Sequence, residues 1–351
     1  MSRKRPVAIA VTALCLLAAG CADSSTETAG DRLPKSGSGA GPGSGAGSGY
    51  PVTVENCGEK QTFTKAPERV VVMNGASVAE VSSLLALGLG DRIVANQQSY
   101  GRSEVKGRAE AIKALPTGDV KPNEAYDIPR EAMLGLRPDL VLSITSYGFD
   151  AKNGFATRDD LSSVSANSYI SPQGCADDPS RMSVADSHTL LRDLGRIFGV
   201  SDRAEKLIAE SQKHIDTISA KVDGEKKPNV MVLFSNMVMG GNDFSSIVAN
   251  GIINDILTKA GGSNAFANSS RNTFADLSKE KVAATSVDAL VVVSYNDPDP
   301  EAYAEKLLKE FPQWPAAKNS TYTVLSDSIY LGPSNDVAVD KLARTLHPGA
   351  F

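Results

Sequence analysis

Four cysteines carry the most reactive side chains of this 351-residue sequence. Cys15 and Cys21 lie within and just after an apolar segment at the amino terminus, whereas Cys57 and Cys175 lie in the body of the chain. If the amino terminus directs export, the last two cysteines reach an oxidising compartment, where thiols tend to pair. We expect a Cys57–Cys175 disulfide; two free thiols or a shared metal are the alternatives.

The amino-terminal segment has the layout of an export signal. Arg3, Lys4 and Arg5 precede an apolar stretch, residues 7–17, which is too short to cross a bilayer as a helix. The following Ala-Ala-Gly-Cys resembles a bacterial lipobox, in which the signal is cut before the cysteine and the sulfur receives diacylglycerol. We expect residues 1–20 to be removed and Cys21 to carry a lipid. Ordinary secretion with a free Cys21 is the alternative.

A second unusual stretch, SGSGAGPGSGAGSG at residues 36–49, contains only Gly, Ser, Ala and one Pro. Such a stretch cannot bury apolar surface and behaves as a flexible coil. We therefore expect residues 21–50 to form a lipid-anchored tether that holds the rest of the chain at the outer face of the cell membrane.

The remaining chain is acidic and long. Its ~300 residues exceed what a single hydrophobic core usually serves, so we expect two lobes. The formal net charge is −5 and becomes more negative once the three basic residues of the signal are lost. This charge excludes nucleic acid as a partner, and we expect a monomer.

Strands that could position a site are predicted from apolar runs such as RVVVM and DALVVVS. These runs lack polar alternation, which is typical of parallel strands covered on both faces. Between the fourth and fifth strand, one apolar stripe predicts a long helix over residues 201–224. We expect α/β lobes at 51–182 and 228–351, joined by a helical connection at 183–227. The predicted strands are 69–73, 92–96, 139–144, 167–170, 229–234, 289–294 and 321–325.

Two segments resemble each other. REAMLGLRPDLVLS and KEKVAATSVDALVVVS each place a glutamate eight residues before an aspartate that begins an apolar strand. Glu131 and Asp139 in the first thus match Glu280 and Asp288 in the second. The repeat indicates two related lobes. From the residues alone, a glutamate in the first turn of a helix is simply favourable with the helix dipole.

The order of these segments resembles the substrate-binding lipoproteins of bacterial ABC importers for iron–siderophore, haem and cobalamin. The matching pieces, which lie in order within residues 66–351, include APERVVVMNGASVAEVSSLLALG, LLRDLGRIFGV and ILTKAGGSNAFA. The resemblance implies the class III periplasmic-binding-protein fold: two Rossmann-like lobes with mostly parallel sheets, joined by one long, rigid backbone helix.

The resemblance also implies ligand and partners. It implies an iron–siderophore complex, or a similar metal chelate, held between the lobes and delivered to an ABC permease dimer with cytoplasmic ATPase subunits. Glu131 and Glu280 match the positions that meet arginines of the permease. Cobalamin, haem or another large cofactor-like solute is the alternative ligand.

Candidate ligand contacts come from the loops after the predicted strands, because ligands of open α/β sheets collect beyond the carboxyl ends of the strands. Aromatic rings, amides and charges in these loops suit an anionic metal chelate. The candidates are Asn74, Tyr100, Arg102, Tyr147, Phe149, Asn236, Asp243, Arg271, Tyr295 and Tyr330.

Enzyme motifs with a nucleophilic serine, a phosphate loop or a zinc-binding His pair do not occur in the body of the chain. His188, His214 and His347 all lie outside the predicted strand-end loops, so we expect no metal held by the protein itself. We expect no cofactor and no catalysis. A cell-envelope enzyme or an adhesion module on the same scaffold is the alternative from another class.

Overall fold

The computed structural model describes residues 49–75, 77–99, 101–237, 244–267 and 269–351. The predicted signal, Cys21 and nearly all of the predicted tether lie outside the described residues. Gly47–Phe351 form one compact unit.

The first lobe is built on a parallel sheet in which the strands lie in the order β4-β3-β5-β6. All four were predicted: β3 (Val70–Val72), β4 (Ile93–Asn96), β5 (Leu140–Thr145) and β6 (Asn167–Ser171). One face packs against α1 (Ala79–Ala86) and α6 (Val184–Ile197). The other face packs against α3 (Arg130–Gly135) and α4 (Arg158–Ser163). Burial of both faces explains the unbroken apolar runs.

A hairpin that was not predicted precedes this sheet: β1 (Val52–Asn56) and β2 (Glu59–Phe63). Its two-residue turn, Cys57-Gly58, is left-handed at both positions, with φ of 53° and 78°, as hairpin turns of this length require. The predicted Cys57–Cys175 disulfide is confirmed and joins this turn to α5 (Pro172–Cys175). The hairpin buries only two apolar side chains, Val54 and Phe63. Two are too few to give the sequence a recognisable strand pattern, so the hairpin was missed.

The second lobe contains the other sheet, in the order β10-β8-β7-β11-β12, with β9 beside β7. Its three longer strands were predicted and are parallel: β7 (Asn229–Phe234), β11 (Ala289–Val293) and β12 (Tyr322–Leu325). The two-residue strands are too short to leave a pattern in the sequence; they are β8 (Ile247–Val248), β9 (Ser263–Asn264) and β10 (Phe274–Ala275).

Alternate side chains of β7 belong to two different hydrophobic cores, one on each face of this sheet. Val232 packs toward α8 (Ile252–Lys259) and α12 (Asn335–Leu346), and Met231 toward the other layer of helices. That layer consists of α9 (Lys279–Ala284), α10 (Pro300–Glu310) and α11 (Pro315–Asn319). The lobe therefore has three layers, and its sheet is buried between two layers of helices.

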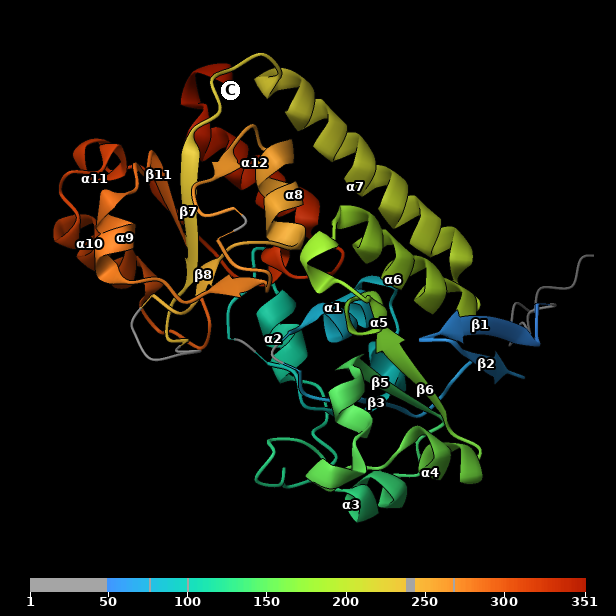
Figure 1. The fold of residues 1–351 in the computed structure, drawn as a ribbon. Helices are drawn as coiled ribbons and strands as arrows, with labels where there is room; N and C mark the ends of the chain where they lie inside the picture. The colour runs from blue at the N-terminus through green and yellow to red at the C-terminus, as the bar shows by residue number, and fades with distance from the viewer. Residues whose placement is uncertain (1–48, 76, 100, 238–243, 268) are drawn as a thin grey trace, which may run out of the picture. The chain divides into compact units, whose positions relative to one another are not determined.

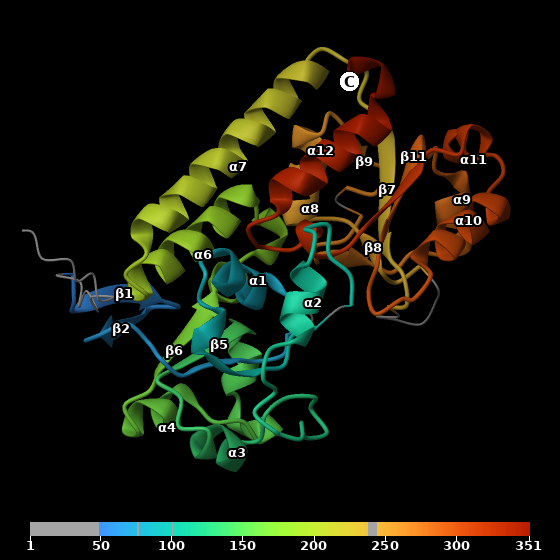
Figure 2. The same ribbon diagram turned by 180° about the vertical axis from the view of Figure 1, so that it is seen from behind.

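The long predicted helix is α7, Ser201–Val222, with 22 residues. The strands of the first sheet precede it and those of the second follow it. Its predicted stripe is buried, including Ile208, Ile215 and Ile218, against α6 and α12 (Figures 1 and 2). The helix starts after Val200 without a side-chain cap.

The repeated Glu–Asp segments occupy equivalent places in the two lobes. Asp139 accepts hydrogen bonds from the backbone N–H groups of Glu68 and Arg69, both at 2.8 Å, just before β3. Asp288 accepts one from the N–H of Asn229 at the start of β7, at 2.9 Å. Each aspartate thus ties the start of its own strand to a neighbouring strand, which explains the repeat.

The shorter helices complete the described structure: α2 (Arg108–Lys113) and the 3-10 helices η1 (Gly90–Arg92), η2 (Ser146–Phe149), η3 (Ala151–Asn153), η4 (Pro179–Arg181), η5 (Asp327–Ile329) and η6 (Pro348–Ala350). In the part of the chain that the structure describes, no helix combines the length and apolar character needed to cross a membrane.

Candidate functional site

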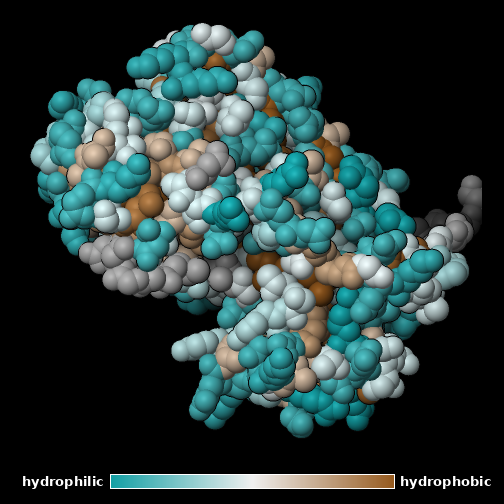
Figure 3. All heavy atoms as spheres, viewed as in Figure 1, coloured by the Kyte–Doolittle hydropathy of each residue, from teal (hydrophilic) through white to brown (hydrophobic). Residues whose placement is uncertain are grey.

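The loops that follow β4 and β12 meet, which brings the carboxyl ends of the two sheets toward each other. Glu104, after β4, accepts hydrogen bonds from the backbone N–H of Ser326 at 2.7 Å and of Ser328 at 3.1 Å. Asp327 in turn accepts from the Ser103 hydroxyl at 2.6 Å and the Glu104 N–H at 3.1 Å. This reciprocal pair of carboxylates, Glu104 and Asp327, joins the lobes. Figure 3 shows the surface hollowed between the part with β8 and the part with α3.

The environment of this junction favours a neutral carboxyl group. Burial and then the negative charge of Glu104 raise the pKa of Asp327 to about 6, although the Ser103 hydroxyl bond opposes the shift. Arg108 on α2 is the nearby cation: burial lowers its pKa and the charge of Asp327 raises it. The sequence analysis missed Glu104 and Asp327, because their pairing joins positions more than 200 residues apart.

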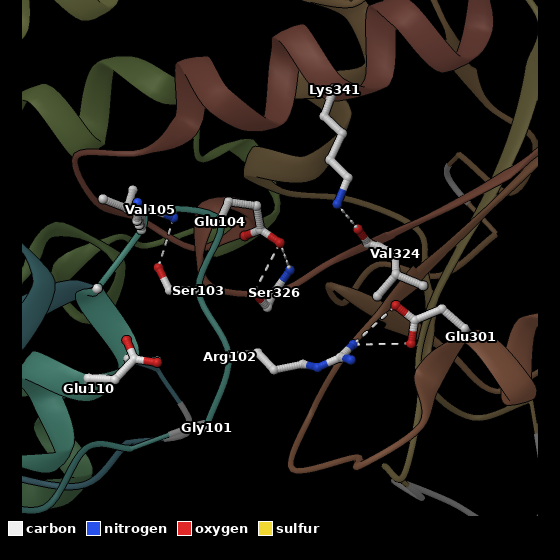
Figure 4. Close-up of a pocket in the computed structure, with 13 residues that line it drawn as sticks. Gly101, Arg102, Ser103, Glu104, Val105, Glu110, Glu301, Val324, Ser326 and Lys341 are labelled. Carbon is white, nitrogen blue, oxygen red and sulfur yellow. Dashed lines mark hydrogen bonds and ion pairs between the residues drawn. The ribbon is translucent and has the colours of Figure 1, made fainter.

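A cavity of about 470 Å³ lies beside the junction and has a charged lining (Figure 4). Arg102, a predicted ligand contact, points across it to Glu301 on α10 and forms an ion pair at 3.1 Å. Lys341 on α12 donates to the carbonyl oxygen of Val324 at 2.6 Å. The charge of Arg102 is therefore already balanced from the second lobe.

A second cavity, of about 400 Å³, lies at the carboxyl ends of β7 and β11. Asn236 lines it and donates from its side-chain amide to the carbonyl oxygen of Asn296 at 3.1 Å. Both asparagines have left-handed backbones, with φ of 56° and 48°, which Asn tolerates better than most residues. The two strand-end loops are thus fixed to each other, and the ligand contact of Asn236 stays a prediction.

Arg271 lines a third cavity, of about 580 Å³, together with Asp178 and Ser180 at the end of the first lobe and Phe274 of the second lobe. The loop that carries Arg271 is held by Asn250, whose side-chain amide donates to the carbonyl oxygens of Ser270 and Asn272 at 2.8 and 3.1 Å. Arg271 itself is exposed, so its guanidinium is presented on a braced loop.

The other predicted contacts fall into different environments. Tyr147 is 52% exposed, whereas Phe149 is only 7% exposed and belongs to the core beneath it. We correct the expectation for Phe149: its ring is a packing residue with little surface for a ligand. Tyr330 packs its ring 5.9 Å from that of Phe234, and Tyr295 is partly buried. Tyr100 and Asp243 lie outside the described residues.

A buried carboxyl group that the sequence analysis missed organises the strand ends of the first lobe. Glu80 on α1 is fully buried and accepts hydrogen bonds from Ser171 at the end of β6 and from the Gln98 amide after β4, the latter at 2.8 Å. The same amide donates to the carbonyl oxygen of Met73 after β3 at 3.0 Å. Burial raises the pKa of Glu80. Glu80 and Gln98 together thus link the ends of β3, β4 and β6.

The two predicted docking glutamates lie in the first turns of the short helices α3 and α9. The Glu131 carboxylate is 84% exposed and lies 3.7 Å from Arg130. Glu280 is exposed, and hydrogen bonds from its own backbone N–H and from Ser278 lower its pKa. Both are free to meet a partner, and that role stays a prediction.

Among the described residues, no three His, Cys, Asp or Glu side chains gather in a way that could hold a metal ion. His214 contacts Asp336 through its Nδ1 at 2.8 Å, and His347 lies 3.1 Å from the carbonyl oxygen of Gly261. His188 is buried on α6, and burial lowers its pKa. His214 and His347 thus make structural contacts, on α7 and in the carboxyl-terminal segment.

Solved structures share this architecture at low sequence identity. A periplasmic binding protein from Veillonella parvula is 20% identical, with a TM-score of 0.67 over 85% of this chain and 97% of that chain. A protein of an ABC-type Fe3+-hydroxamate transport system from Saccharomonospora viridis is 23% identical, with a TM-score of 0.66 over 84% and 99%. A periplasmic haem-binding protein from Roseiflexus is 23% identical, with a TM-score of 0.58 over 81% and 99%.

The sequence comparisons add the family. No curated protein matches the chain significantly. A family model described as periplasmic binding protein matches residues 70–327, from β3 in the first lobe to η5 in the second. The match therefore spans both sheets, α7 and the junction between the lobes. The chain belongs to the periplasmic binding protein family, whose members bind solutes outside the cytoplasm and do not catalyse a reaction.

Proposed function

We propose that this chain is the substrate-binding lipoprotein of an ABC importer and that it captures an iron–siderophore complex between its two lobes. The observation that carries the proposal is the meeting of strand-end loops from both sheets at Glu104 and Asp327, with a single helical connection between the lobes. In open α/β sheets, ligands bind at this edge. A solute held there contacts both halves at once.

The side chains at these strand ends suit a large polar solute better than a bare ion. Arg271 presents a guanidinium, Asn236 lines a cavity with its amide, and Tyr147 presents an aromatic face. Each of these groups is of a kind that binds an anionic ferric chelate. Cobalamin, haem or another large cofactor-like solute is the alternative, since it also combines flat and charged surfaces.

Delivery requires an anchor and a partner. We propose that Cys21 carries the lipid and that residues 21–50 form the tether. Glu131 and Glu280 would then engage one half each of a permease dimer whose ATPase subunits lie in the cytoplasm. Two contact points on one molecule bind a partner more tightly than either point alone when their spacing matches the spacing of the two sites on the partner.

Deletion of the gene tests this function directly. Cells would be grown without free iron and supplied in turn with radioactive iron as ferric hydroxamate, ferric catecholate or haem. We expect the deletion to abolish uptake of at least one of these compounds and a plasmid copy to restore it. Normal uptake of every compound, with altered adhesion or altered turnover of an envelope substrate, would contradict the proposal and favour the alternative class.

A further inference from the structure

Two exposed tyrosines lie on the strand-end edge of the first lobe. Tyr126 is 78% exposed and Tyr147 is 52% exposed. Single exposed apolar residues are ordinary on protein surfaces and need no function. These two are different, because the backbone around each ring is held in place by side chains at the ends of β3 and β5.

Tyr126 has a left-handed backbone, with φ of 63°, which a bulky aromatic residue adopts only when its surroundings impose it. The Asn74 side chain, directly after β3, donates to the carbonyl oxygen of Tyr126 at 3.0 Å. The N–H of Tyr126 donates to the carbonyl oxygen of Asn123 at 2.9 Å. The backbone is therefore fixed on both sides of a side chain that faces water.

Tyr147 follows β5 in the 3-10 helix η2, and its N–H donates to the Thr145 hydroxyl at 3.3 Å. A Cβ atom at Gly148 would lie 2.5 Å from the Ser143 hydroxyl oxygen, so only glycine lets this turn sit so close to the strand. The Tyr147 ring packs against Phe155 in a T-shaped contact, at 5.7 Å between centroids and 72° between planes. Tyr147 is still 52% exposed, so part of its ring faces water.

The segments that carry the two rings are hydrogen-bonded together. The Asn123 side chain donates to the carbonyl oxygen of Asn153 at 2.8 Å, two residues before Phe155. The N–H of Arg130 donates to the carbonyl oxygen of Gly154 at 2.9 Å. Strands β3 and β5 are also neighbours in the sheet. Both tyrosines therefore belong to one braced surface at the carboxyl ends of adjacent strands.

We propose that Tyr126 and Tyr147 form an aromatic wall of the ligand site and that the solute carries a flat conjugated face. This inference rests on the proposed function and narrows its substrate class. The ring faces of tyrosine stack on conjugated surfaces and gain little from an aliphatic chelate. Catecholate rings around a metal and a porphyrin-type macrocycle both offer such a face, whereas an aliphatic trihydroxamate does not.

The test is a titration of the full chain with three probes: a ferric tricatecholate, haemin and ferrioxamine B, which is an aliphatic ferric trihydroxamate. Binding is followed by the absorption of each probe. Tryptophan fluorescence is a poor readout here, because Trp314 is only 1% exposed. Tyr126→Ala and Tyr147→Ala remove one ring each, and Tyr126→Phe keeps the ring. Val164→Ala is the matched control, since Val164 is similarly exposed, at 51%, on the same lobe.

We expect one of the two conjugated probes to bind at least ~10-fold more tightly than ferrioxamine B. Each Ala variant should weaken that binding by about 3- to 10-fold, the range of one aromatic contact. Tyr126→Phe and Val164→Ala should stay close to wild type. The conjugated probe whose binding is weakened by the Ala variants, the tricatecholate or haemin, identifies the kind of flat face that the site recognises.

Two results would overturn the inference. If ferrioxamine B binds most tightly and the Ala variants bind it like wild type, the aromatic wall is wrong while the proposed receptor function stands. If wild type binds none of the three probes, the metal-chelate function fails and the inference fails with it.

Discussion

At the scale of single residues, the Cys57–Cys175 bridge shows what residue type and compartment can predict. An exported chain with two remaining cysteines leaves one intramolecular pairing, and the structure contains it. The burial of Glu80 could not be predicted in the same way, because its partners Gln98 and Ser171 lie 18 and 91 residues away. Phe149 was misassigned for a related reason: sequence places it in a strand-end loop but does not show that its ring turns inward.

The bridge closes a loop with a sequence separation of 118, which restricts the unfolded chain. We expect Cys57→Ser to lower the free energy of unfolding by about 5 kcal/mol on the loop-entropy model. Cys175→Ser should have the same effect, and the double variant should lose no more than either single one. Chemical denaturation of the three variants measures this; additive losses would show that the cysteines act separately.

At the scale of elements, hydrophobic pattern predicted the seven longer strands of the two sheets and α7, since each buries a continuous apolar face or stripe. It failed for the β1–β2 hairpin and for β8, β9 and β10, whose few residues are fixed by pairing with neighbours rather than by their own pattern. The same limit applies to the site. Strand ends were predictable, but the hydrogen bonds that shape the loops beyond them were not.

The helices α3 and α9 give a second prediction. Replacing Glu131 and Glu280 together by Ala should leave ligand affinity unchanged and reduce uptake by about tenfold or more, since the loss of an interfacial charge contact readily costs that much. Glu124→Ala with Glu305→Ala, an exposed glutamate in each lobe, is the control. Affinity and uptake are measured in parallel. Weakened ligand binding with normal delivery would place the two glutamates in the ligand site instead.

At the scale of the whole molecule, one apolar core runs from the first sheet through α6 and α7 to the second sheet, and Glu104 and Asp327 join the lobes through polar contacts. The stability of the folded chain depends on pH through buried carboxyl groups, one of which lies at this junction. Burial raises the pKa of Asp327 and of Asp127 to about 6 from 3.8. The folded chain therefore holds these protons more tightly than the unfolded chain, so their stabilising effect is complete below about pH 4 and is lost as the pH rises through about 6.

We expect the melting temperature to fall between pH 5 and pH 7.5 by about 2–4 °C for each ~1 kcal/mol lost. Asp327→Asn should flatten this slope, because an amide does not titrate. Asp119→Asn, at an exposed aspartate, should leave it unchanged. Calorimetry across this range measures the slope. A melting temperature that rises over the same range in wild type and in the Asp327 variant alike would show that ionisation of Asp327 does not destabilise the junction.

The central claim is that the two lobes hold one solute between them and return it unaltered. Native mass spectrometry tests it most directly, on protein purified from cells grown in iron-poor medium and then exposed to the chelate whose uptake requires it. We predict one intact chelate with one iron per chain, released with its mass unchanged when the protein is unfolded. A chemically altered product, or a chain that retains nothing, would contradict the account.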